Sequence, residues 1–153
     1  RLRRSILLRL NPQDYGWDQH ERWRDSGLDI QFDTGEKKIK ALIRKSRLNI
    51  ATYNATSFLE VLSWNMPTIC FWSETHFEIN DEAKLYFDKL RKVGIFHNNP
   101  ESAARQMTQV WDDIDKWWKS ETVQSAREEF CGKYVRSPDK NKSTTIFKDY
   151  CRK

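Results

Sequence analysis

Short apolar runs alternate with amphipathic stretches along this chain, and the alternation predicts strands and helices in turn. In residues 36–47, for example, Ile39, Leu42 and Ile43 recur at helical spacing beneath a basic face that we interpret as solvated. Predicted strands cover residues 5–10, 28–33, the start of 48–72, 68–72 and 94–97. Predicted helices cover residues 18–26, 36–47, the middle of 48–72, 81–93, 99–117 and 123–134, with a short terminal helix after a polar loop at 137–144.

This order of strands and helices predicts an α/β protein with a Rossmann-like parallel sheet flanked by helices. We expect one such domain in residues 1–118 and a helical, basic C-terminal extension in residues 119–153. Right-handed crossovers place the loops that follow the strands at one edge of a parallel sheet. A ligand site is therefore expected in those loops.

Residues 48–72 contain the most informative of these units, a strand, a short turn, a helix and a second strand. Asn54, Thr56 and Ser57 gather at the predicted start of the helix. Hydroxyls and free backbone N–H groups at a helix N-terminus suit a phosphate-bearing ligand. The alternative is that Thr56 or Ser57 only caps the helix. Glu60, one turn further on, can accept hydrogen bonds from the vicinal hydroxyls of a ribose, or can be a surface residue paired with a lysine.

Residues with special backbone preferences mark where the predicted helices begin and end. Asn65 tolerates the left-handed conformation that ends the helix of residues 48–72. Asn80 or Asp81 is expected to cap the next helix, which Gly94 ends. Asn99 is expected to cap the helix after that, because a proline and a glutamate follow it.

Composition narrows the function classes. The net charge of +5 is concentrated near the two ends of the chain, so nucleic-acid binding is not expected. No run approaches the ~18 apolar residues of a transmembrane helix. The 3 cysteines lack the spacing of a zinc site or a disulfide framework, and Cys70 lies in an apolar strand as packing. We expect no metal, a reducing cytoplasm as the location, and a longer parent protein.

Residues 56–62 together with 65–69 resemble the nucleotide-diphosphate recognition element in the C-terminal domain of GT-B glycosyltransferases. More closely, residues 53–60, 67–72, 81–90 and 94–101 are similar to a transferase family encoded among bacterial surface-polysaccharide genes, including those for lipopolysaccharide. The resemblance spans roughly residues 5–118 by the order of elements. Two departures are Asn65, where the GT-B pattern usually has glycine, and the absence of a glycine pair before the helix.

The resemblance implies the C-terminal half of a GT-B fold and a role for each candidate residue. Thr56 and Ser57 would hold the donor phosphates, and Asn54 would orient their turn. Glu60 would bind hydroxyls of the donor's ribose or sugar, and Arg9 would neutralise phosphate charge. His76 follows the second apolar strand and could face the cleft.

The resulting expectation is the donor-binding half of a transferase that uses a nucleotide-diphosphate sugar, or a related activated group, in bacterial surface polysaccharide synthesis. No cofactor is expected besides this donor. The catalytic base would come from an N-terminal domain that this chain lacks. The location would be the cytoplasm, and one form of this hypothesis places the protein at the inner face of the membrane. Two alternatives stay open. One is a nucleotide-sugar epimerase of GT-B architecture, and the other is an interaction module that docks a partner through Trp117, Trp118 and its basic tail.

Overall fold

The computed structural model describes residues 5–11, 13 and 15–135, and divides the chain into two compact units, residues 1–45 and 46–153. Unit 1 contains β1 (Ile6–Leu8), α1 (Gln19–Asp25), β2 (Ile30–Phe32) and α2 (Ile39–Ile43). Its two strands are parallel, with Ile6 opposite Ile30 and Leu8 opposite Phe32. The helix predicted over residues 36–47 is only five residues long, and no side chain caps its start.

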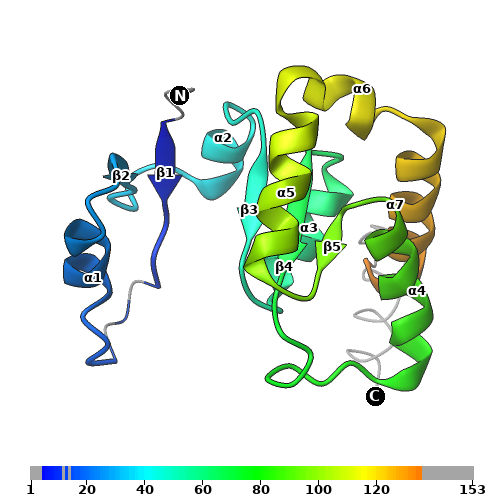
Figure 1. Ribbon diagram of the computed structural model, residues 1–153, viewed down its shortest axis with the longest axis horizontal. Helices are drawn as coiled ribbons and strands as arrows, with labels where there is room; N and C mark the ends of the chain where they lie inside the picture. Colours follow the sequence, from blue (N-terminus) through cyan, green and yellow to red (C-terminus); the bar gives the residue numbers. More distant parts are fainter. Residues whose placement is uncertain (1–4, 12, 14, 136–153) are drawn as a thin grey trace, which may run out of the picture. The chain divides into compact units, whose positions relative to one another are not determined.

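Unit 2 contains a parallel three-stranded sheet with the order β3-β4-β5 (Figure 1). Its strands are β3 (Asn49–Ala51), β4 (Thr68–Phe71) and β5 (Phe96–His97). Its helices are α3 (Thr56–Ser63), α4 (Asp81–Lys92), α5 (Pro100–Val110), α6 (Ile114–Trp118) and α7 (Glu121–Tyr134). The predicted α/β class with parallel strands is confirmed, but the strands form two small sheets. The predicted terminal helix and the loop at 137–144 lie outside the described residues.

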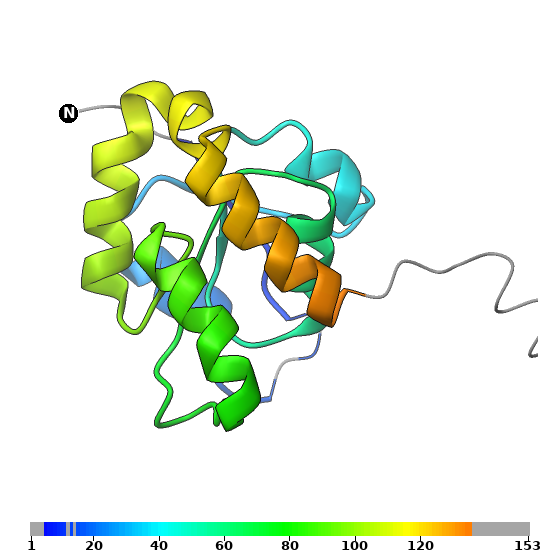
Figure 2. The ribbon, with the colours of Figure 1, turned by 90° about the vertical axis from the view of Figure 1, so that its right-hand side faces the viewer.

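The helices of unit 2 enclose an aromatic core. Helix α5 lies on one face of the sheet and α3 on the other, and α4 and α7 pack side by side (Figures 1 and 2). Neighbouring rings in the core lie 4.8–6.4 Å apart between centroids. The rings belong to Phe58, Trp72, Phe87, Phe96 and Phe130. Because Phe130 lies on α7, this helix is part of the core of unit 2, while the predicted boundary at residue 118 stays a prediction.

The predicted helix starts and ends are confirmed at four positions. The Oδ1 atoms of Asn80 and Asn99 accept hydrogen bonds from the third residue of α4 and of α5, at 2.7 and 2.8 Å. Gly94 has φ 77° two residues after the end of α4, and Asn65 has φ 53° two residues after the end of α3. Asparagine tolerates this left-handed conformation better than most residues, because its short polar side chain can hydrogen-bond locally.

The helix predicted over residues 99–117 is interrupted. Residues Trp111–Asp113 form a 3₁₀ turn between α5 and α6. The carboxylate of Asp113 accepts a hydrogen bond from the backbone N–H of Lys116 at 3.0 Å, which starts α6 as a new helix. Aspartate competes with the helical backbone in this way, so it favours a helix start over a helix interior.

Trp117 and Trp118, which the docking alternative assigned to a partner, both pack within unit 2, Trp118 as a buried residue and Trp117 as a partly buried one. The Trp118 indole Nε1 donates to the backbone oxygen and to Oδ1 of Asn65, at 3.1 and 2.9 Å. The Trp117 indole Nε1 donates to the backbone oxygen of Val93 at 3.0 Å. Trp118 is only 2% exposed. Both polar tips therefore have partners within unit 2, as buried tryptophans generally require.

Cys70 is the buried thiol that the sequence predicts. It lies in β4, and burial raises its pKa to about 12. Because the thiolate is the reactive form, we expect Cys70 not to react with Ellman's reagent in the folded protein at pH 8 and to react once guanidinium unfolds the chain. Thiol counting in a Cys131→Ser/Cys151→Ser variant measures Cys70 alone. Rapid reaction of the folded variant would contradict the closed packing of β4.

Candidate functional site

The loops that follow β3, β4 and β5 lie at one edge of the sheet in unit 2, because the three strands are parallel. Asn54 lies in the loop after β3, and Thr56 and Ser57 form the start of α3. His76 lies in the loop after β4, the strand next to β3. The fold thus brings these four predicted residues to the carboxyl edge of the same sheet. Ligands of open α/β sheets bind at this edge.

The N-terminus of α3 has no side-chain cap, unlike those of α4 and α5. Its capping position is occupied by Ala55, which has no side-chain acceptor. Within the described residues, the hydroxyls and backbone N–H groups of Thr56 and Ser57 have no hydrogen-bond partner. The alternative that Thr56 or Ser57 caps the helix is therefore wrong. This helix start carries unpaired donors together with the positive end of the helix dipole.

Glu60 and Asn54 are exposed beside this helix start. In the described part of the chain, the Glu60 carboxylate forms no ion pair, so the lysine-paired alternative is not what the structure contains. Tyr53, next to Asn54, is 55% exposed. These side chains are accessible to solvent.

Arg9 lies in unit 1 and has an acidic partner there. Its Nη1 is 3.0 Å from Oδ2 of Asp33, at an angle that falls short of a hydrogen bond. The other Asp33 oxygen accepts the backbone N–H of Gly35 at 3.1 Å, and the Asp33 side chain is only 6% exposed. Asp33 follows β2 as Arg9 follows β1, so the parallel pairing of the two strands joins them. The guanidinium charge assigned to phosphate is thus offset within unit 1.

A chain of hydrogen bonds leads to His76 in the loop after β4. The hydroxyls of Ser73 and Thr75 lie 2.6 Å apart, and Thr75 Oγ1 lies 3.1 Å from His76 Nδ1. The backbone N–H of Thr75 also donates to Ser73 Oγ at 3.3 Å. Sequence reasoning identified His76 but missed Ser73 and Thr75, although their spacing around a histidine was visible.

Arg91 ties the loop after β4 to the loop after β5. Its Nη2 donates to Glu74 Oε1 in the first loop and to Asn98 Oδ1, 3.0 Å away, in the second. Its guanidinium also pairs with Asp88 and lies over the ring of Phe96, 5.3 Å from the centroid. No local sequence pattern predicts the contact between Arg91 and Glu74, because these residues are 17 positions apart.

His97 serves a structural role at the end of β5. Its Nε2 lies 3.1 Å from the backbone oxygen of Gly94. Partial burial lowers the pKa of His97, and the nearby positive charges of Arg105 and Arg91 act in the same direction, against the hydrogen bond to Gly94. The ring therefore favours the neutral form, and this histidine is not a charged group of the carboxyl edge.

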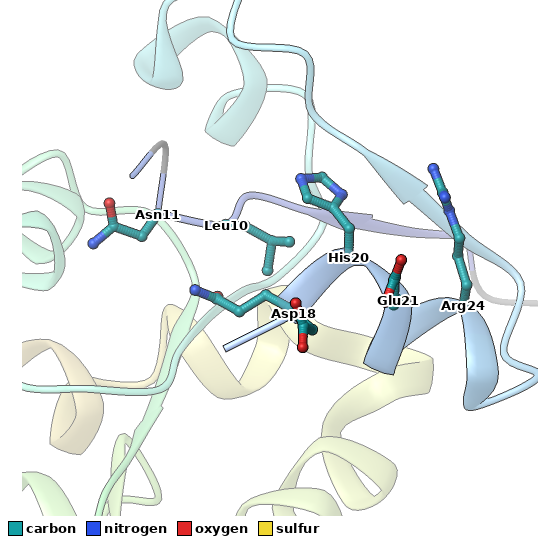
Figure 3. Close-up of a pocket in the computed structure, with 7 residues that line it drawn as sticks. Leu10, Asn11, Asp18, His20, Glu21 and Arg24 are labelled. Carbon is teal, nitrogen blue, oxygen red and sulfur yellow. The ribbon is translucent and has the colours of Figure 1, made fainter. Parts of the chain in front are cut away.

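Unit 1 has a separate pocket of about 240 Å³ between the end of β1 and α1 (Figure 3). The ring of His20, one of its walls, packs on Phe32 with 4.8 Å between centroids. None of the predicted site residues lines this pocket. Its lining consists of Leu10, Asn11, Asp18, Gln19, His20, Glu21 and Arg24.

The described residues contain neither a metal-site grouping nor a membrane-spanning helix. No three His, Cys, Asp or Glu side chains among them are grouped so that they could hold a metal ion. In the same residues, every helix is too short or too polar to cross a bilayer.

Comparison with known proteins gives a family for the chain. No curated protein matches it, and no solved structure matches it. A family model described as LIC12162 family transferase matches residues 1–146. The match extends over both units and all of the carboxyl-edge residues described above. The chain therefore belongs to the LIC12162 family of transferases.

Proposed function

We propose that this chain is the donor-binding part of a transferase that uses a nucleotide-activated sugar, or a related activated group, in bacterial surface polysaccharide synthesis. One observation carries the proposal: α3 starts without a side-chain cap at the carboxyl edge of a parallel sheet. An anion that accepts the unpaired N–H groups of Thr56 and Ser57 would satisfy donors that otherwise face water. Membership of a transferase family supports a group-transfer substrate.

In this proposal the diphosphate lies at the first turn of α3. The hydroxyls of Thr56 and Ser57 add donors to the backbone N–H groups, and the helix dipole favours negative charge there. The Glu60 carboxylate, which has no ion pair in the described residues, accepts hydrogen bonds from ribose or sugar hydroxyls. Asn54 holds the turn that precedes the helix.

The finer fold assignment belongs to the same proposal. Strands and helices alternate from β1 to α5, and strands pair in parallel in each unit. This order supports a Rossmann-like domain of the kind found in the C-terminal half of GT-B enzymes. A catalytic base supplied by another domain and a cytoplasmic location complete the hypothesis.

The contacts in unit 2 bear on the docking alternative but not on the epimerase alternative. The docking alternative used Trp117, Trp118 and the basic tail, and the indole N–H groups of both tryptophans bond inside unit 2. The epimerase alternative shares the donor site, so only catalysis separates it from a transferase. Turnover that needs an acceptor identifies a transferase, whereas conversion of the sugar without an acceptor identifies an epimerase.

Calorimetric titration of the chain with UDP, CDP, GDP and UMP tests the donor site. We expect saturable binding that prefers one nucleoside diphosphate, and at least tenfold weaker binding by a Ser57→Ala/Glu60→Ala variant. Each lost hydrogen bond to a charged partner costs about 1.5–3 kcal/mol, so two lost groups exceed a tenfold effect.

A matched control removes the same residue types from another helix. Glu121→Ala/Ser125→Ala changes two exposed residues of α7 and is expected to bind like the unmodified chain. Equal loss of binding in both double variants would point to general destabilisation. The absence of diphosphate binding by the unmodified chain, with its circular dichroism spectrum intact, would overturn the proposal.

A further inference from the structure

Helix α1 of unit 1 buries none of its residues. Its residues are exposed except Gln19, which is half-buried. Trp23, the one apolar residue of the helix, is 37% exposed, and Trp17, just before the helix, is 60% exposed. Exposed aromatic surface that is rimmed by polar side chains is typical of ligand-binding grooves and interaction sites.

Two hollows on α1 meet at Gln19. One is the pocket of about 240 Å³ in Figure 3, where the side chains of His20, Glu21 and Arg24 project from α1. The other has a volume of about 450 Å³, within the ~300–1,000 Å³ of small-molecule sites. Its α1 residues recur at helical spacing, so they share one face of the helix. The second hollow is lined by Trp17, Gln19, Arg22, Trp23 and Ser26.

Local contacts fix the backbone around both tryptophans. Gly16 and Asp18, on either side of Trp17, have the left-handed φ angles 76° and 47°. The ring of Tyr15 packs beside that of Trp17, with 5.2 Å between centroids. At the end of α1, the Ser26 hydroxyl donates to the backbone oxygen of Trp23 at 2.6 Å. These contacts leave both indole rings exposed in one hollow.

The polar groups of the smaller hollow are open to a ligand. Within the described part of the chain, the Glu21 carboxylate and the Arg24 guanidinium form no ion pair. Oδ1 of Asn11 accepts the backbone N–H of Gln13 at 3.0 Å, which leaves the amide N–H groups of Asn11 for another partner. A carboxylate, a guanidinium and an amide together supply both acceptors and donors for hydroxyl groups.

The charges along α1 favour a neutral ligand. The carboxylates of Asp18, Glu21 and Asp25 offset the guanidinium groups of Arg22 and Arg24. Nucleic acids and anionic lipid surfaces are recognised by predominantly basic patches, which this helix does not have. A sugar ring is neutral, its hydroxyls both donate and accept, and its C–H face packs flat on an aromatic ring. The combination of exposed indoles with unpaired polar groups therefore suits a sugar.

We propose that the two hollows on α1 form a binding site for a pyranose sugar. Trp17 and Trp23 supply the stacking surface, and Glu21, Arg24 and Asn11 form hydrogen bonds with the sugar hydroxyls. The site belongs to unit 1, whereas the diphosphate site belongs to unit 2, so the inference goes beyond the proposed function. In a transferase that builds polysaccharide, this sugar is part of the acceptor, and only that assignment rests on the proposed function.

Nuclear magnetic resonance titration of the ¹⁵N-labelled chain tests the sugar site. The probes are the methyl pyranosides of glucose, galactose, mannose and N-acetylglucosamine. Trp17→Phe and Trp23→Phe variants identify the two indole N–H signals among those of the 7 tryptophans. We expect saturable shifts of both signals with at least one glycoside and an unchanged signal for the buried Trp118.

Substitutions in the two hollows should weaken this binding. We expect at least tenfold weaker binding by Trp17→Ala/Trp23→Ala, because both stacking rings are lost. Glu21→Gln should bind several-fold more weakly, because hydrogen bonds to a charged group are stronger than those to a neutral amide. The matched control is Leu28→Ala, which removes an apolar side chain that is 57% exposed in the same unit but lines neither hollow. This control should bind like the unmodified chain.

The outcomes distinguish a sugar site from other uses of the tryptophans. Failure of every glycoside to bind, equal binding by the double tryptophan variant, or equal loss in Leu28→Ala would overturn the inference. Self-association that the double variant abolishes, without glycoside binding, would assign the tryptophans to a second copy of the chain and overturn it as well. Titration with UDP keeps the two sites apart: UDP binding without glycoside binding overturns only the sugar site, and glycoside binding without UDP binding overturns only the donor site.

Discussion

Replacing Trp118 with alanine is expected to lower the free energy of unfolding by about 3–5 kcal/mol. The side chain is 2% exposed, and its indole N–H holds Asn65 through two acceptors, so the substitution leaves a cavity and unpaired carbonyl oxygens. Trp118→Phe keeps most of the apolar contact and loses the hydrogen bonds, so it should lower the free energy of unfolding much less than Trp118→Ala does. The intermediate variant separates packing from hydrogen bonding.

Guanidinium unfolding followed by circular dichroism at 222 nm measures these changes. Tyr53→Ala removes an aromatic side chain that is 55% exposed in the same unit, and it should change stability by less than about 0.5 kcal/mol. An unchanged midpoint for Trp118→Ala would mean that this residue is not part of the core. The interaction-module alternative requires that result, because a tryptophan reserved for a partner contributes little to folding of the isolated chain.

Phe130→Ala is expected to cost a similar amount, about 3–5 kcal/mol. The Phe130 ring is 1% exposed and lies 6.1 Å from Phe58 of α3 and 5.1 Å from Phe87 of α4, between centroids. It therefore joins α7 to both helices. Truncation removes these aromatic contacts in addition to the buried area.

The same unfolding experiment tests Phe130, with Leu85→Ala as control. Leu85 lies on α4 and is 59% exposed, so its truncation should leave the midpoint almost unchanged. Limited proteolysis provides a second measurement. If the substitution releases α7 from α3 and α4, α7 should be the first segment to be cleaved. A stable Phe130→Ala variant would show that residues 119–135 extend from the domain, as the boundary at 118 predicts, and are not needed for its core.

Much of unit 2 could be predicted because its signals are local. Asn80 and Asn99 cap helices that begin one residue later, and Gly94 and Asn65 end helices through their own backbone conformation. The length of the helix at Ile39–Ile43 was overestimated, because hydrophobic periodicity indicates which side of a helix is apolar but not where the helix ends.

The candidate site was only partly predictable. The sequence led to the turn that carries Thr56 and Ser57 and to His76, because the order of elements assigns these loops to one edge of a parallel sheet. It left open whether a side chain caps α3, a question that depends on the backbone conformation of Ala55. It also left out Asp33 as the partner of Arg9, since the pairing of β1 with β2 creates that contact.

The sequence by itself determined the alternation of strands and helices, most helix boundaries and which loops follow the strands. Each of these depends on residues within one or two turns of one another, where hydrogen bonding and dihedral preferences act. Only the tertiary structure decided that Trp118 holds Asn65, 53 residues away, and that Arg91 joins two loops. Such contacts bring together segments that are distant along the chain, so no local pattern encodes which residues will meet. Burial and ion pairing at these meeting points separate core residues from those left accessible to a ligand.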